Sequence, residues 1–147
     1  MRAVVTRVSS ASVTIDGVVE GEIGRGYLVL LGVGPEDTPD VCDKLAERIC
    51  NLRVFEDENG KMNLNLEQVS GELLVVSQFT LYADTSSRRP GFSGAAKPEL
   101  AVPLYERFMD RCRQRGFRVA HGRFGADMKV TSVNDGPVTI LYDTQHS

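Results

Sequence analysis

Residues 27–33 read YLVLLGV, an uninterrupted apolar run that follows Gly24-Arg25-Gly26. A run of this length and composition is typical of a β-strand that is covered on both faces. Such a strand must lie in a sheet that has helices or a second sheet packed against it. The run therefore predicts a layered domain with this strand near its centre.

Further strands are predicted before this run. Residues 1–8 and 11–15 each have the composition of a strand, and Asp16-Gly17 is a favoured two-residue hairpin turn. The return strand of that hairpin is expected over residues 18–23.

A helix is predicted after the central run. Thr38-Pro39 is typical of a capping hydroxyl followed by proline at the first helical position. Apolar residues then recur at helical spacing, namely Val41, Leu45, Ile49 and Leu52. The helix is expected to end near Asn51.

The middle of the chain contains a predicted strand pair, a buried strand and a loop. Residues 52–55 and 62–66 flank the turn DENG at 57–60, and residues 72–81 begin as a buried strand that becomes polar at Ser77-Gln78. Polar residues at the end of a buried strand often mark a functional site. Residues 83–97 are rich in Ser, Gly and Pro and are predicted to form a loop.

The last part of the chain is predicted to contain a second helix and three strands. The helix begins at Pro98 or at Pro103, ends before Gly116, and buries an apolar face at Leu104, Phe108 and Cys112. Strands are expected over 117–120, 128–133 and 138–142, with NDGP at 134–137 joining the last two. The pattern as a whole indicates an α/β domain with more strand than helix.

Composition limits the kind of protein. With 147 residues, 41% of them hydrophobic, the chain fits one domain over residues 1–147. The chain has neither the apolar stretch of a signal peptide at its start nor a run of 18 apolar residues, which predicts a cytoplasmic protein without a membrane span. Cys42, Cys50 and Cys112 form no C-x-x-C pair, and only two histidines occur, so neither a metal site nor a cofactor is expected.

The charges are unevenly distributed along the chain. Residues 86–130 carry ten basic and four acidic side chains, whereas the rest carries seven basic and sixteen acidic ones. A polyanion can be held by such a basic segment, although a run like RFMDRCRQRGFR is more often a solvated helix surface. The basic side chains are Arg88, Arg89, Lys97, Arg107, Arg111, Arg113, Arg115, Arg118, Arg123 and Lys129.

Two short motifs, SQFTL at 77–81 and NDGPVT at 134–139, together resemble the signature pair of the D-aminoacyl-tRNA deacylase family. The resemblance extends to MRAVVTRVSSASVTIDG at the start, NLRVFEDENGKMNLN in the middle and GRFGADMKV before the second motif. It implies a strand-rich domain with two main helices and a strongly curved, barrel-like, mixed or antiparallel sheet. It also implies a homodimeric hydrolase that acts on the ester at the 3′ end of aminoacyl-tRNA.

The resemblance implies a pocket that is built mainly from main-chain atoms of Ser77, Gln78, Phe79 and Thr80. Backbone N–H groups at a strand end can stabilise the negative charge that develops on an ester oxygen under attack. Thr80 as a nucleophile would need a base, and His121 and His146 lie outside both motifs, so direct attack by water is favoured. The terminal 2′-hydroxyl of the tRNA is expected to assist. The alternative is that Ser77 and Thr80 merely satisfy hydrogen bonds at a strand end.

For the second motif, the resemblance implies a cis peptide bond between Gly136 and Pro137 that enters the partner subunit's site and excludes L-amino acids. Arg7 resembles the residue that supports this tip, and Phe124 and Met128 resemble the neighbours of the adenosine; Asn134 belongs to the same motif. The alternatives are a plain turn at 134–137, a surface Arg7, and core positions for Phe124 and Met128.

The chain departs from the family pattern in one loop, where Arg89-Pro90-Gly91-Phe92 has glycine in place of the usual serine. Two other functions are compatible with the sequence: that of a non-catalytic RNA-binding or dimerisation module, and that of a threonine-dependent esterase.

Overall fold

The computed structural model describes residues 1–146 and contains eight strands, two α-helices and one 3₁₀ helix. In chain order these are β1 (Arg2–Ile15), β2 (Val18–Ile23), β3 (Gly26–Gly32), α1 (Pro39–Asn51), β4 (Phe55–Glu56), β5 (Met62–Leu64), β6 (Glu72–Ser77), the 3₁₀ helix η1 (Phe79–Tyr82), α2 (Pro98–Gln114), β7 (Val119–His121) and β8 (Lys129–Asp143).

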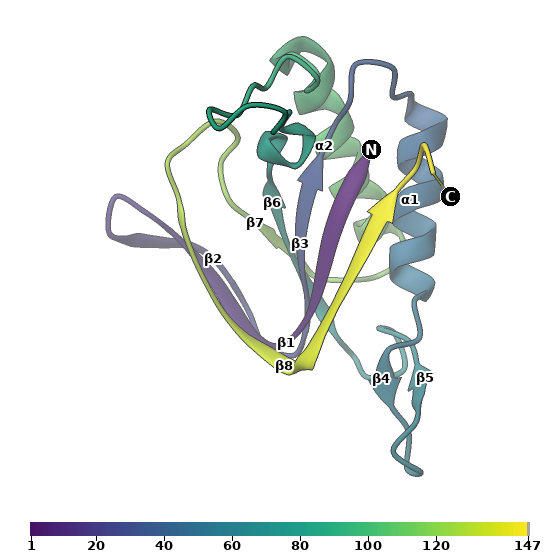
Figure 1. Ribbon diagram of the computed structural model, residues 1–147. Coiled ribbons are helices and arrows are strands. Elements are labelled where there is room, and N and C mark those ends of the chain that lie inside the picture. The colour runs from purple at the N-terminus through teal and green to yellow at the C-terminus, as the bar shows by residue number, and fades with distance from the viewer. Residues whose placement is uncertain (147) are drawn as a thin grey trace.

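One mixed sheet of six strands organises the domain. Its order is β2-β1-β3-β6-β7, with β8 paired to the other side of β1, and a separate small hairpin joins β4 to β5. Strand β1 is antiparallel to β2, β3 and β8, whereas β6 is parallel to β3 and β7. The sheet curls until its ends meet, because a Cβ atom on Gly21 of β2 would lie 2.7 Å from the backbone oxygen of His121 in β7. The result is the barrel-like sheet that the resemblance implied (Figure 1).

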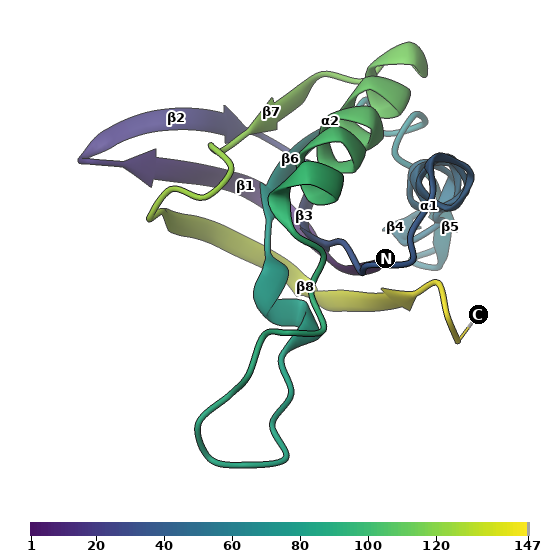
Figure 2. The ribbon, with the colours of Figure 1, turned by 90° about the horizontal axis from the view of Figure 1, so that it is seen from above.

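Strand β3 is buried on both faces, as its apolar run predicted. Tyr27, Val29 and Leu31 belong to the large core beneath the helices, whereas Leu28 belongs to a smaller core inside the curl of the sheet. Helices α1 and α2 lie side by side on one face of the sheet (Figure 2).

The predicted helix ends are confirmed. The Thr38 hydroxyl accepts a hydrogen bond from the Val41 N–H, and α1 runs from Pro39 to Asn51. Helix α2 starts at Pro98, so Pro103 lies inside it, and Gly116 follows it with φ +95°. Within residues 1–146, neither helix has the length and apolarity needed to cross a membrane.

Two sequence predictions about strands were wrong. Residues 1–8 and 11–15 belong to the single strand β1, and residues 134–137 do not reverse the chain, because β8 continues from Lys129 to Asp143. Both halves of β8 pair with β1, which is bent near Val8, and the residues between Asn134 and Thr139 bulge out opposite Arg7. The turn-like composition of NDGP thus serves a bulge rather than a hairpin.

Candidate active site

A cleft of about 270 Å³ lies at the end of β6, where the chain becomes polar. It brings Ser77, Gln78 and Phe79 together with Phe124 and Met128, which are about 45 residues further along the chain. The remaining lining residues are Val76, Gly125, Ala126, Asp127 and Val130. Three of the four residues of the predicted segment therefore share one cleft with the predicted adenosine neighbours.

A main-chain donor at the end of β6 extends past the neighbouring strand. The Leu73 N–H bonds to Arg118 on the β7 side, whereas the Gln78 N–H bonds to Leu31 on the β3 side. Since successive residues of a strand alternate in direction, the N–H group of Ser77, the last residue of β6, points to the β7 side. Strand β7 pairs with β6 only as far as Val75, so this N–H group extends beyond it.

The 3₁₀ helix leaves two further donors free of helical bonds. Its first hydrogen bond runs from the Leu81 N–H to the Gln78 carbonyl, at 3.2 Å. The N–H groups of Phe79 and Thr80 precede that bond and have no carbonyl within the helix to which they can donate. Two lining residues of the cleft, Ser77 and Phe79, therefore carry main-chain donors of the kind that stabilise an oxyanion.

Thr80 does not line the cleft, although the sequence placed it in the catalytic segment. Its hydroxyl accepts a hydrogen bond from the Gln78 side-chain amide. The exposed Asp127 is the only titratable side chain among the cleft's lining residues. His121 lies outside the cleft, at the end of β7, where its Nδ1 is 2.6 Å from the Gly122 carbonyl oxygen.

A side chain of helix α2 is hydrogen-bonded to β6 near the end of that strand. The Tyr105 hydroxyl donates to the Val75 carbonyl at 2.9 Å, and its ring centroid lies 6.3 Å from that of Phe124. Burial raises the pKa of Tyr105 to about 12, so the hydroxyl remains a donor at neutral pH. Phe124 packs against the core, as the alternative for this residue had it, and it also lines the cleft.

The second motif forms an exposed tip on β8. The Gly136–Pro137 peptide bond is cis, as the resemblance implied, and both residues are exposed. Asn134 closes the bulge, because its side-chain oxygen accepts from the Val138 N–H at 3.0 Å.

Arg7 supports this tip from within the protein. Its side chain is buried and donates to the carbonyl oxygens of Asp135 at 2.8 Å and Val54 at 2.6 Å. The alternative that Arg7 is a surface strand residue is therefore wrong.

The two motifs of one chain do not meet. The tip lies opposite Arg7, which pairs with Tyr27, whereas Ser77 pairs with Leu31 at the other end of β3. Four residues of strand separate these positions by about 13 Å. Figure 1 shows the bend of β8 at the opposite end of the sheet from η1.

The model of the family described as D-Tyr-tRNA(Tyr) deacylase matches residues 4–143. The chain belongs to this family. A D-aminoacyl-tRNA deacylase of Symbiobacterium thermophilum is 57% identical over 146 residues, which is 99% of this chain and 97% of the relative. The corresponding protein of Clostridioides difficile is 56% identical over 148 residues, covering 100% and 99%.

Solved structures show the same deacylase fold. A protein described as c-Myc DNA Unwinding Element Binding Protein superposes with a TM-score of 0.91 at 43% identity, over 97% of this chain and 98% of that one. A probable eukaryotic D-amino acid tRNA deacylase has a TM-score of 0.83 at 18% identity, over 96% and 97%.

Several lining residues of this deacylase-family chain were missed by sequence reasoning. Gly125, Ala126 and Asp127 follow Phe124 directly, so the stretch GRFGADMKV that carried part of the resemblance was the available signal. No group of three or more His, Cys, Asp or Glu side chains within residues 1–146 is arranged to hold a metal.

Proposed function

We propose that this protein hydrolyses the ester that joins a D-amino acid to the 3′ end of tRNA. The cleft at the end of β6 supports this most directly, because Ser77 and Phe79 line it, the Ser77 N–H extends past the end of β7, and the Phe79 N–H precedes the first bond of the 3₁₀ helix. Such donors stabilise the oxyanion of an ester under attack. The named relatives act on the same class of substrate, as their names state.

In this mechanism water attacks the ester carbonyl directly. The carbonyl oxygen accepts hydrogen bonds from the Ser77 and Phe79 N–H groups while the tetrahedral intermediate forms. The bond between the acyl carbon and the ribose oxygen then breaks, the ribose alkoxide takes the proton that the attacking water has lost, and free amino acid and tRNA leave. The 2′-hydroxyl of the terminal adenosine assists. Gln78 forms part of the cleft wall, and its side-chain amide donates a hydrogen bond to the Thr80 hydroxyl.

Chiral selection belongs to a homodimer in which one protomer's tip enters its partner's cleft. Two observations support this. Gly136 and Pro137 lie away from their own chain's cleft, and β8 is an exposed edge on which Val133 is 54% and Leu141 is 76% exposed. Exposed apolar side chains along a sheet edge favour association.

The carbonyl groups of Gly136 and Pro137 hold the substrate's α-amino group in this arrangement. The side chain of a D-amino acid then points out of the cleft, whereas that of an L-amino acid collides with the tip. Removing D-amino acids from tRNA in this way is a proofreading step of translation quality control, and it places the enzyme in the cytoplasm.

The test is hydrolysis of D-tyrosyl-tRNA, L-tyrosyl-tRNA and glycyl-tRNA by the purified protein. We expect the D-ester and glycyl-tRNA to be cleaved, because glycine has no side chain to collide with the tip, and L-tyrosyl-tRNA to persist. Release of labelled amino acid measures all three. Cleavage of neither tyrosyl ester would favour a non-catalytic RNA-binding module, and cleavage of both would refute selection by the tip.

Asp127→Asn and Thr80→Ala test the absence of a side-chain base or nucleophile. A general base contributes typically about 10² to 10⁴ in rate, so loss of one would be evident in single-turnover hydrolysis of D-tyrosyl-tRNA. We expect each variant to stay within about tenfold of the parent protein. A covalent acyl-enzyme, or complete loss of turnover in Thr80→Ala, would instead identify a threonine-dependent esterase.

A further inference from the structure

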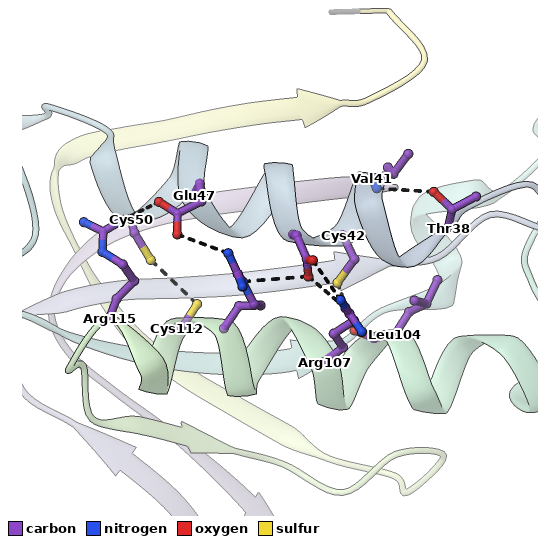
Figure 3. A network of polar contacts seen from close by, with 11 residues as sticks. Thr38, Val41, Cys42, Glu47, Cys50, Leu104, Arg107, Cys112 and Arg115 are labelled. Carbon is purple, nitrogen blue, oxygen red and sulfur yellow. Dashed lines mark hydrogen bonds and ion pairs between the residues drawn. The ribbon is translucent and has the colours of Figure 1, made fainter.

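Most arginines of the basic segment are already paired within the protein. Arg107 Nε lies 2.8 Å from Asp43 Oδ1, and Arg115 Nη1 lies 2.6 Å from Glu47 Oε2, so the two acids on α1 neutralise arginines on and just after α2 (Figure 3). The hydrogen bond from Arg107 holds the pKa of Asp43 below its usual value. Six of the ten basic residues lie within ion-pair distance of a carboxylate, namely Arg107, Arg111, Arg113, Arg115, Arg118 and Arg123.

The other four cations of the segment are exposed and have no carboxylate partner within residues 1–146. Arg88 and Arg89 lie in the loop between η1 and α2, Lys97 occupies the position just before α2 at the end of that loop, and Lys129 begins β8. Figure 2 shows this loop projecting far from the rest of the domain. A positive charge without an internal partner is available to an external anion.

The loop is anchored beside the cleft. Two backbone hydrogen bonds between Asp84 and Gly91, of 2.7 and 2.9 Å, close its neck. Phe92 follows Gly91 directly in the chain, and its ring packs edge-on against Phe79, a lining residue of the cleft, with centroids 5.1 Å apart. Phe79 is 53% and Phe92 is 37% exposed, so both rings offer apolar surface at the mouth of the cleft.

A second hollow beside the cleft is less suited to a polyanion. It has a volume of about 500 Å³, shares Phe124 with the cleft and lies against α2. Glu20, Glu106 and Asp110 line that hollow, and its two arginines, Arg113 and Arg123, already pair with Asp110 and Glu20. A phosphate backbone there would meet three carboxylates and two arginines that are already paired.

We propose that the η1–α2 loop, residues 83–97, binds the nucleotides that precede the terminal adenosine of the tRNA. Arg88 and Arg89 contact the phosphates, and the Phe79–Phe92 pair offers an aromatic surface on which a base of the single-stranded end stacks. This inference rests on the proposed function, since the terminal adenosine fixes which nucleotides reach the loop.

The experiment compares Arg88→Gln/Arg89→Gln with Lys44→Gln/Lys61→Gln. The second pair changes the net charge equally at exposed lysines that line neither the cleft nor the loop. Deacylated tRNA is the binding probe at several salt concentrations, and D-tyrosyladenosine, which has no phosphates, is the small substrate. The logarithm of the binding constant falls linearly with the logarithm of the salt concentration, and each phosphate contact to a single strand contributes about 0.7 to the steepness of that line. Losing two contacts should therefore make the line shallower by about 1.4 and lower the affinity at low salt by about tenfold.

Three results would overturn the proposal. The first is an unchanged affinity of the Arg88/Arg89 variant for tRNA, and the second is an equal loss of affinity in the Lys44/Lys61 variant. The third is an Arg88/Arg89 variant whose mass in solution is smaller than that of the parent protein. An unchanged rate on D-tyrosyladenosine is expected, and a decrease would assign the loop to the cleft itself. If the proposed hydrolysis were wrong, the parent protein would cleave neither D-tyrosyl-tRNA nor D-tyrosyladenosine. The comparison of tRNA binding between the two double variants would still test the loop.

Discussion

Phe79→Pro is expected to lower the rate of D-ester hydrolysis about 10² to 10³-fold below that of Phe79→Ala, because one oxyanion donor commonly contributes that much. Both variants lose the aromatic ring, but only proline also removes the main-chain N–H group to which the proposed mechanism assigns the oxyanion. Phe79 is the first residue of η1, a position where helices tolerate proline. The preceding residue, Gln78, has φ −141° and ψ 78°, outside the α region that proline disfavours.

The measurement is single-turnover hydrolysis of D-tyrosyladenosine, because this substrate excludes effects on tRNA binding. Thermal unfolding of both variants is the structural control, and we expect similar midpoints. Equal rates in the two variants would show that the Phe79 N–H does not stabilise the reaction, and the main-chain mechanism would then have to be abandoned.

The central layers of the fold could be predicted because their signals are local. The apolar run of β3 and the Thr38-Pro39 start of α1 depend on a few adjacent residues, and the structure has both as expected. The continuity of β8 could not be predicted in the same way. It depends on pairing with β1, whose paired residues lie 115 to 141 positions earlier in the chain, whereas the local composition of NDGP favours a turn.

The candidate site shows the same division. The polar end of β6 was evident at Ser77-Gln78, but the facing wall comes from Phe124 and Met128 in another part of the chain. The excess of basic side chains in residues 86–130 suggested more available positive charge than the structure has, for a related reason. Asp43, which neutralises Arg107, lies 64 residues before it, so no count along the segment reveals the pair.

Gly136→Ala is expected to disable the tip without removing any hydrogen-bonding side chain. An added Cβ would lie 2.7 Å from Val138 Cγ2 and 3.0 Å from an Arg7 guanidinium nitrogen, at a residue whose φ is +137°. A side chain is strained at this φ, and Arg7 is held by its bonds to Asp135 and Val54, so the tip must move. This variant alone should lose at least about a hundredfold in kcat/KM for D-tyrosyl-tRNA, since a displacement of about 1 Å can cost that much.

A heterodimer of Gly136→Ala and Phe79→Pro protomers should nevertheless recover about half the activity of the parent dimer, because a two-fold assembly has two equivalent sites. One site then combines the intact cleft of the first protomer with the intact tip of the second, and the other site has both defects. Purification through two different affinity tags isolates the mixed species, and each variant homodimer serves as its control. If tip and cleft acted within one chain, every protomer would carry a defect and the mixed dimer would be as inactive as its parents. Recovered turnover therefore requires that a protomer's Gly136 serve its neighbour's Phe79.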